Sequence, residues 1–162
     1  MAAVDYFLKI DGIKGESADS KQSGEIELDS WSWGATQSGG HAYGGGGGAG
    51  KVQMQDFHFC MRLNEASPKL LEACSRGKHI PQATLTCRKA GGEQGAFLKV
   101  KFSDMLVSSY QTGGSGGSDI VPVDQISLNF SKIEFEYFKQ DKAGAMVSAG
   151  KTGWDLKKNA KV

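Results

Sequence analysis

The chain reads Glu25-Ile26-Glu27-Leu28-Asp29-Ser30-Trp31-Ser32-Trp33-Gly34 over residues 25–34, and its two pairs of apolar residues are out of phase. Successive side chains of a β-strand point to opposite faces, so the pair Ile26 and Leu28 would lie on one face and the two tryptophans on the other. The strand must therefore bulge or bend between the two pairs.

The same shift of phase recurs at three other places. It falls between Met54 and Phe57, between Phe102 and Met105, and between Phe130 and Ile133. A single shift is explained by a bulge. Repeated shifts indicate strands that bend from one sheet to another at the corners of a barrel, or strands that bury one face in the subunit and the other against a neighbouring chain. Both alternatives predict a closed or packed β-structure.

Regular alternation of apolar and polar residues predicts further strands on both sides of this stretch. These strands cover residues 4–10, 83–87, 97–110 and 126–137. The last of them completes the expected set, and the end of the chain is interpreted as a tail. One short helix is predicted between Ser67 and Gly77, with Ser67 as N-cap, Pro68 at the first helical position and Gly77 at the C-terminal end.

A glycine-rich stretch separates two of the apolar segments. It consists of Ser38, Gly39, Gly40, His41, Ala42, Tyr43, Gly44, Gly45, Gly46, Gly47, Gly48, Ala49 and Gly50. A run of glycines loses more backbone entropy on ordering than any other sequence. We therefore expect this stretch to be ordered by a partner outside the subunit.

Two nucleotide-binding motifs can be drawn through the same stretch, but neither has the required context. The spacing of Gly45, Gly47 and Gly50 fits a dinucleotide fingerprint, and Lys51 after Gly50 fits part of a P-loop. However, Val52 replaces the Ser or Thr that would hold magnesium, and the segment that follows alternates like a strand rather than a helix. Nucleotide binding is therefore not expected.

Length and charge exclude several classes of function. The chain has 162 residues, of which 39% are hydrophobic, so we expect a single domain over residues 1–162. The 19 basic and 18 acidic residues leave a net charge of +1, which does not favour binding to nucleic acid or to an anionic membrane. No segment is apolar over a length that could span a bilayer, and the start lacks the pattern of a signal peptide. We expect a protein that is made and folded in the cytosol.

No catalytic or metal-binding constellation is found. The three cysteines, Cys60, Cys74 and Cys87, form no C-x-x-C pair and are expected to be reduced and buried. His41, His58 and His79 do not have the close spacing of metal ligands. A Cys74–His79 nucleophile is not favoured because Cys74 lies on the apolar face of the predicted helix. We expect a non-enzyme without cofactor or metal.

Trp31 and Trp33 admit two interpretations, a platform for stacking sugars or anchors in the core. Their shared face within one strand favours the core. Ser32 then points the other way. A small hydroxyl on that face suits a surface that must let varied cargo pass without binding it tightly.

Several short motifs together resemble the haemolysin-coregulated protein (Hcp) family, which builds the inner tube of the bacterial type VI secretion system. The motifs are Lys14-Gly15-Glu16-Ser17, Trp31-Ser32-Trp33-Gly34, Gly44 to Gly50 with Lys51, Ser67-Pro68, Gly77-Lys78-His79, Arg88-Lys89-Ala90-Gly91-Gly92 and Gly153-Trp154. They occur in order and cover nearly the whole chain.

The resemblance implies a mainly β fold, a compact antiparallel β-barrel of two packed sheets with one short α-helix and an extended glycine-rich loop. It also implies homohexameric rings that stack into a hollow tube, a contractile sheath that ejects the tube, a spike protein at its tip and secreted effectors in its lumen. On this basis we expect Ser32 to face the lumen and cargo, and the stretch from Ser38 to Gly50 to serve ring stacking. The protein would be cytoplasmic before ejection and then secreted without a signal peptide.

One alternative from another class stays open, a small-ligand-binding β-barrel of unrelated role. Subunit mass separates the two hypotheses, because a ligand-binding barrel would be a monomer or dimer.

Overall fold

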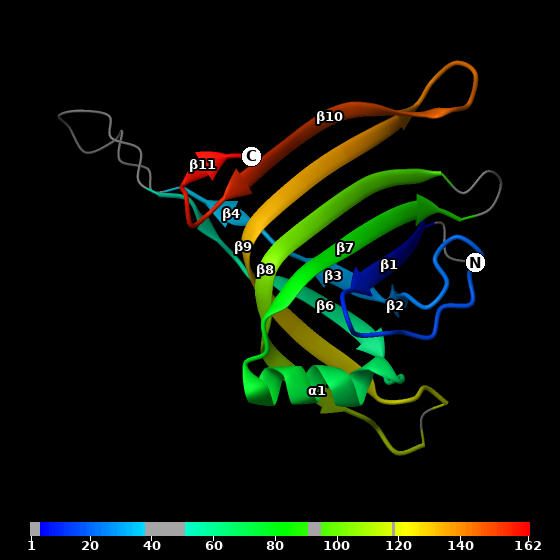
Figure 1. Cartoon of the computed structure of the whole chain (residues 1–162). Helices are drawn as coiled ribbons and strands as arrows, with labels where there is room; N and C mark the ends of the chain where they lie inside the picture. The colour runs from blue at the N-terminus through cyan, green and yellow to red at the C-terminus, as the bar shows by residue number, and fades with distance from the viewer. Residues whose placement is uncertain (1–3, 38–50, 91–94, 118) are drawn as a thin grey trace.

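The computed structural model describes residues 4–37, 51–90, 95–117 and 119–162 (Figure 1). The elements are β1 Val4–Ile10, β2 Ile26–Leu28, β3 Ser30–Ser32, β4 Ala35–Thr36, β5 Gln53–Met54, β6 Phe57–Arg62, α1 Ala66–Arg76, β7 Ile80–Lys89, β8 Ala96–Gly113, β9 Val123–Gln140, β10 Met146–Asp155 and β11 Ala160–Lys161. The expectation of a mainly β, antiparallel fold with one short α-helix is confirmed.

One large antiparallel sheet contains nine of these strands. Its order is β11-β10-β9-β8-β7-β1-β2, and β9 also pairs with β6, which in turn pairs with β3. The sheet curls so that β7 and β8 face β6 and β3 across the core, while β9 connects the two layers by pairing with both β8 and β6 (Figure 1). Its two ends, β2 and β3, are consecutive in the chain and separated by Asp29, and no ladder joins them among the described residues. A separate ribbon is formed by β4 and β5.

The first phase shift marks a change of strand partner. Leu28 of β2 pairs with Tyr6 of β1, whereas Trp31 of β3 pairs with Phe59 of β6. Between them, the N–H of Asp29 donates a hydrogen bond to the carbonyl of Cys60, 2.9 Å away. The predicted bend between the two apolar pairs is confirmed, but both halves of the segment belong to one nine-stranded sheet and not to two packed sheets.

The shifts in β8 and β9 lie at the same level of the sheet. Phe102 pairs with Ile133 on one side of the bend, and Met105 pairs with Phe130 on the other. Asp104, in the bend, has a left-handed backbone with φ of 54°. Because both strands change phase together, their register is kept through the bend, and apolar side chains face the core above and below it.

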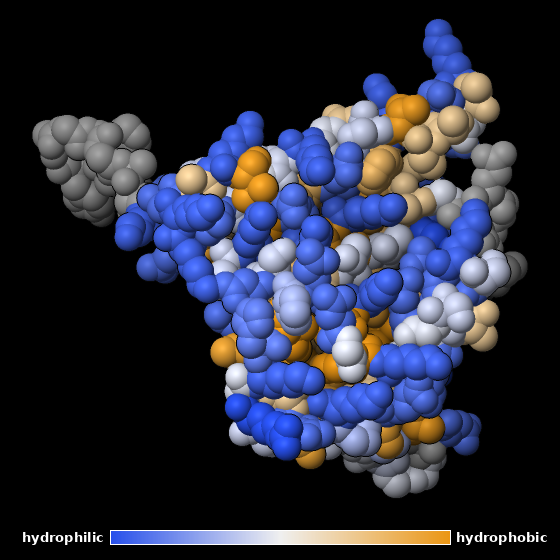
Figure 2. Space-filling view, viewed as in Figure 1, coloured by the Kyte–Doolittle hydropathy of each residue, from blue (hydrophilic) through white to orange (hydrophobic). Residues whose placement is uncertain are grey.

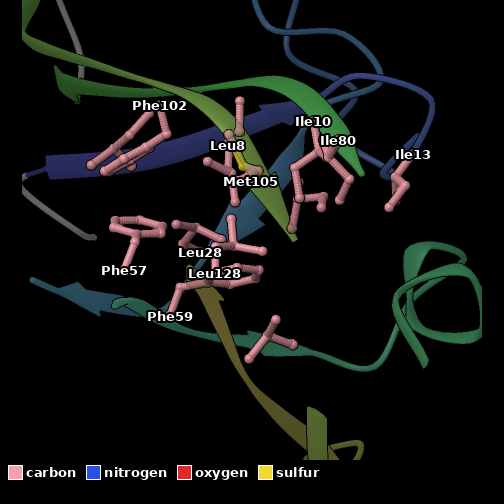
Figure 3. Close-up of a cluster of buried hydrophobic side chains, with 14 of the residues drawn as sticks. Leu8, Ile10, Ile13, Leu28, Phe57, Phe59, Ile80, Phe102, Met105 and Leu128 are labelled. Carbon is pink, nitrogen blue, oxygen red and sulfur yellow. The ribbon is translucent and has the colours of Figure 1, made fainter. Parts of the chain in front are cut away.

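The core is aromatic at its centre. The ring centroids of Phe57 and Phe102 lie 4.6 Å apart, and those of Phe57 and Phe59 lie 5.8 Å apart (Figure 3). Phe102 also contacts Phe130, with ring centroids 4.9 Å apart. α1 lies across one end of the curled sheet (Figure 1) and buries Leu70. Full burial of such side chains stabilises the fold by roughly 1.5–3 kcal/mol each.

The start of the helix differs from the prediction. Ser67 is not the N-cap; it is buried within α1, and Glu65 occupies the cap position without a side-chain hydrogen bond. The side-chain oxygen of Asn64 accepts a hydrogen bond from the N–H of Ala66 instead, at 2.8 Å. The C-terminal prediction is confirmed, because Gly77 has a left-handed backbone with φ of 61°.

Two further expectations are wrong. The chain does not end in a tail after β9, because β10 pairs with β9 from Lys132 to Gln140 and β11 pairs with β10. Most of β10 is exposed on both faces, so it lacks the alternation that reveals a strand. Of the three cysteines only Cys87 is buried, whereas Cys60 and Cys74 are half-buried.

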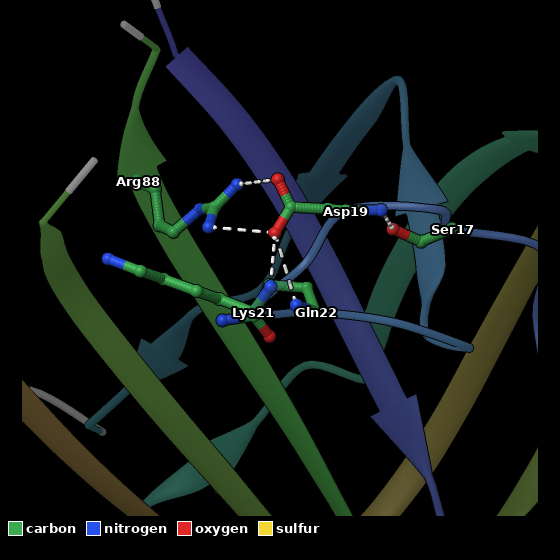
Figure 4. A network of polar contacts seen from close by, with 5 residues as sticks. All are labelled: Ser17, Asp19, Lys21, Gln22 and Arg88. Carbon is green, nitrogen blue, oxygen red and sulfur yellow. Dashed lines mark hydrogen bonds and ion pairs between the residues drawn. The ribbon is translucent and has the colours of Figure 1, made fainter. Parts of the chain in front are cut away.

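An ion pair between a buried arginine and a half-buried aspartate holds the loop between β1 and β2. The Arg88 side chain, only 2% exposed, donates hydrogen bonds to both carboxylate oxygens of Asp19, at 3.0 and 2.6 Å (Figure 4). Its guanidinium also lies 4.8 Å from the ring centre of Phe7. The N–H groups of Lys21 and Gln22 donate to the same carboxylate. The hydrogen bonds from Arg88, and then that from Lys21, lower the pKa of Asp19 to about 2.

We expect Asp19→Asn to lower the melting temperature at pH 7, because it leaves the buried Arg88 guanidinium without its counter-charge. A carboxyl whose pKa is depressed in the folded state stabilises above its unfolded pKa of about 4, and this contribution is lost as pH falls toward the folded value. The difference in melting temperature between parent and variant should therefore shrink from pH 5 toward pH 2. Asp11→Asn, at an exposed aspartate, is the control; a difference that stays constant over this range would contradict the assignment.

Candidate functional site

The outward face of β3, β6, β9 and β8 carries a continuous row of small polar side chains. Ser32 pairs with His58 across β3 and β6, and His58 pairs with Ser127 across β6 and β9. Ser127 in turn pairs with Ser109 of β8. We call this surface the polar wall; it consists of Ser30, Ser32, His58, Cys60, Ser109, Gln111, Gln125 and Ser127.

The opposite face of β3 is fixed by the tryptophans. Trp31 meets Tyr6 edge-on, with ring centroids 5.9 Å apart, and stacks on Phe57 at 6.3 Å. Trp33 meets Phe135 at 6.0 Å. Both tryptophans are partly buried against the core, which confirms their interpretation as anchors. Ser32 therefore lies on the outward face, and it is exposed.

The eight residues of the polar wall carry no carboxylate, ammonium or guanidinium group. They offer hydroxyl, amide, imidazole and thiol groups. At one edge the Asp56 carboxylate is held by Ser108 at 2.7 Å and by Asn129 at 2.9 Å. Small polar groups that stay solvated gain little from any one partner, because each new hydrogen bond replaces one to water. Such a surface can contact many proteins weakly.

A buried polar network lies beneath the wall and docks α1 on the sheet. The fully buried Asp124 of β9 accepts hydrogen bonds from Ser67 of α1 at 2.6 Å and from the Tyr110 hydroxyl of β8 at 3.0 Å. Burial, and next the hydrogen bond to Asp124, raise the pKa of Tyr110. No sequence pattern indicates this network, since it depends on which strands become neighbours.

The other residues that the sequence analysis considered are not part of the polar wall. The stretch Ser38 to Gly50 lies outside the described residues; on either side of it, Thr36 pairs with Gln53 in the β4–β5 ribbon. His79 contacts the carboxylate of Asp104, which also binds Lys157, and the hydrogen bonds from Lys157 and then from His79 lower the pKa of Asp104.

Neither a metal site nor a membrane-spanning helix is indicated in the described parts of the chain. There, no group of three or more His, Cys, Asp or Glu side chains could hold a metal ion. α1 is neither long nor apolar enough to cross a membrane.

The sequence analysis did not identify His58 and Ser127 as neighbours of Ser32 on the wall, although part of this surface could have been predicted. Phe57 and Phe59 alternate with His58 and Cys60, so the two polar residues had to share the face opposite the phenylalanines. What the pattern could not give was the register that places His58 beside Ser32 and Ser127.

Comparison with known proteins gives one consistent family. Residues 7–137 match the family described as "Type VI secretion system effector, Hcp". The chain is 47% identical over 159 residues to Protein hcp1 of Pseudomonas aeruginosa, covering 97% of this chain and 98% of that protein.

Solved structures agree. Hcp1 from Salmonella typhimurium has a TM-score of 0.82 and 37% identity, covering 99% of this chain and all of that one. A structure described as a type six secretion system protein has a TM-score of 0.90 and 33% identity, with the same coverage. The chain therefore belongs to the Hcp family of type VI secretion system proteins.

Proposed function

We propose that this chain is the structural subunit of a type VI secretion tube. Hexameric rings of the chain stack into a hollow tube, which a contractile sheath ejects with a spike protein at its tip. The tube carries or protects effectors in its lumen. The observation that carries the proposal is the polar wall, an extended, uncharged surface of small side chains on the face opposite the core.

A tube must let cargo move past its inner surface. Large apolar side chains there would hold cargo by burying its surface, and charged side chains would select cargo by sign. The polar wall presents no large apolar side chain, and the charged side chains nearest to it, Asp56 and Arg62, lie at its edges. We therefore assign it to the lumen, with Ser32 among the cargo-facing residues.

Contacts between neighbouring copies have candidates elsewhere on the surface. Tyr137 and Val147 are exposed on the β9–β10 hairpin, and Figure 2 shows hydrophobic residues gathered over the outer end of this hairpin. Contacts of this kind, between different patches of identical chains, are satisfied when the chains close into a ring. The glycine-rich stretch from Ser38 to Gly50 is proposed to act between stacked rings.

The alternative function, a small-ligand-binding barrel, is not favoured by the described interior. Side chains from both layers meet there, and Phe57, Phe59 and Phe102 are fully buried. A barrel that holds a ligand keeps a cavity where these rings lie.

We expect the purified protein to form a closed hexamer without added metal or nucleotide. Native mass spectrometry would give the ring mass directly, and light scattering at micromolar concentration would follow it in solution. A monomer mass that does not change with concentration would contradict the proposal.

Ser32→Gln should impair cargo loading without breaking the ring, because a longer side chain projects from the wall while the tryptophan face is untouched. Co-purification of effector with the variant hexamer measures the effect. Ser115→Gln, at an exposed serine in the loop after β8, is the matched control. Retention of effector at the parent level, or loss of the hexamer, would show that the face is wrongly assigned.

Deleting Gly45 to Gly48 should leave the subunit folded and the hexamer intact but stop export. Loop-closure entropy changes by only about 0.6 kcal/mol per doubling of length, so the fold should lose little stability. Each lost hydrogen bond between rings would cost about 1 kcal/mol, repeated around the ring. Melting temperature, ring mass and secretion should be compared. If the deletion variant unfolds, or if it is secreted normally, the glycine-rich stretch does not act in ring stacking alone.

A further inference from the structure

The polar wall contains a thiol and an imidazole that lie next to each other. His58 and Cys60 are two residues apart on β6, so their side chains share one face, and the Cys60 Sγ lies 4.0 Å from the His58 Nε2. The other ring nitrogen, Nδ1, lies 3.2 Å from the Ser127 hydroxyl on β9. Both Cys60 and His58 are half-buried, so the pair is held in place yet open to solvent.

This arrangement has the parts that activate a nucleophile. A side chain that can lose a proton lies within reach of a base, and a third group orients that base. Reactive thiols are found in partly exposed surroundings beside a histidine.

The other two cysteines provide an internal contrast. Cys87 is fully buried, and burial raises its pKa to about 12, so it is inert in the folded chain. Cys74 is half-buried like Cys60 but lies on α1, and among the described contacts no imidazole is hydrogen-bonded to its sulfur. Cys74 therefore separates the effect of exposure from the effect of His58.

We propose that Cys60 is a reactive thiol that exchanges with small disulfides, with His58 as the base and Ser127 as the residue that positions its ring. His58 Nε2 takes the thiol proton, and the Cys60 sulfur attacks one sulfur of the disulfide. A new S–S bond forms to Cys60 while the original disulfide bond breaks. The leaving thiolate takes the proton from His58, so that Cys60 is oxidised and the small disulfide is reduced to one free thiol and the protein-bound half.

The site is on the same surface as Ser32. Ser30 lies directly across the strand pair from Cys60, and Ser32 directly across from His58. A mixed disulfide at Cys60 would therefore add a bulky group to the polar wall. The reactivity itself does not depend on the proposed tube, so its test can succeed or fail independently of the test on Ser32.

The experiment incubates the intact, folded protein with oxidised glutathione at pH 7 and follows adduct formation by mass spectrometry of the whole chain and its peptides. Cys60 should be modified at least about tenfold faster than Cys74. Cys60→Ser should abolish the fast phase, and Cys74→Ser should leave it unchanged. A Cys60 rate no greater than that of Cys74 would overturn the proposal.

Two variants test the roles of the neighbouring side chains. His58→Gln should slow modification of Cys60 by about tenfold while that of Cys74 stays unchanged. Ser127→Ala should slow Cys60 by a smaller factor, and Ser127→Thr, which keeps the hydroxyl, should restore it. Melting temperatures check folding, and labelling in urea, where the three thiols react alike, gives the reference rate. If His58→Gln does not fold, the comparison of Ser127→Ala with Ser127→Thr tests the assigned roles instead. Rates of Cys60 modification that are unchanged in the folded variants would contradict these roles.

Discussion

The contact between Phe57 and Phe102 joins the two layers of the curled sheet, and the rest of the structure depends on it. These rings lie 4.6 Å apart, and each also contacts a further phenylalanine, so β6, β8 and β9 are held around one aromatic centre. Because side chains alternate along a strand, fixing the phenylalanines inward fixes His58 and Cys60 outward. The inner packing thus determines the composition of the outer surface.

Bends in the sheet let its long strands contribute side chains to the core and to the outer surface. β8 and β9 change phase opposite each other, so their ladder continues while the sheet curves around the core. β2 and β3 change partner at Asp29, which turns Trp31 inward and Ser32 outward. The side-chain pairs that hold the β1–β2 loop and α1 in place, Arg88 with Asp19 and Ser67 with Asp124, include no residue of the polar wall. Substitutions on the wall are therefore separable from folding.

Much of this could be predicted where the sequence alternates clearly. The bends followed from phase shifts, and the family, whose members are structural and secreted components rather than enzymes, followed from several short motifs in order. β10 was missed because exposure on both faces leaves no apolar pattern. Ser67 was misread because a serine before proline suits a cap as well as a buried hydrogen bond. The wall's register depends on strand pairing, which single-strand patterns do not encode.

The central claim is that the face bearing Ser32 lines a channel when copies of this chain assemble. A cryo-electron microscopy map of the assembled protein tests it most directly. The account predicts that Ser30, Ser32, His58 and Ser127 of every copy surround the central opening. A map in which this face contacts a neighbouring copy, or lies on the outside of the assembly, would contradict it.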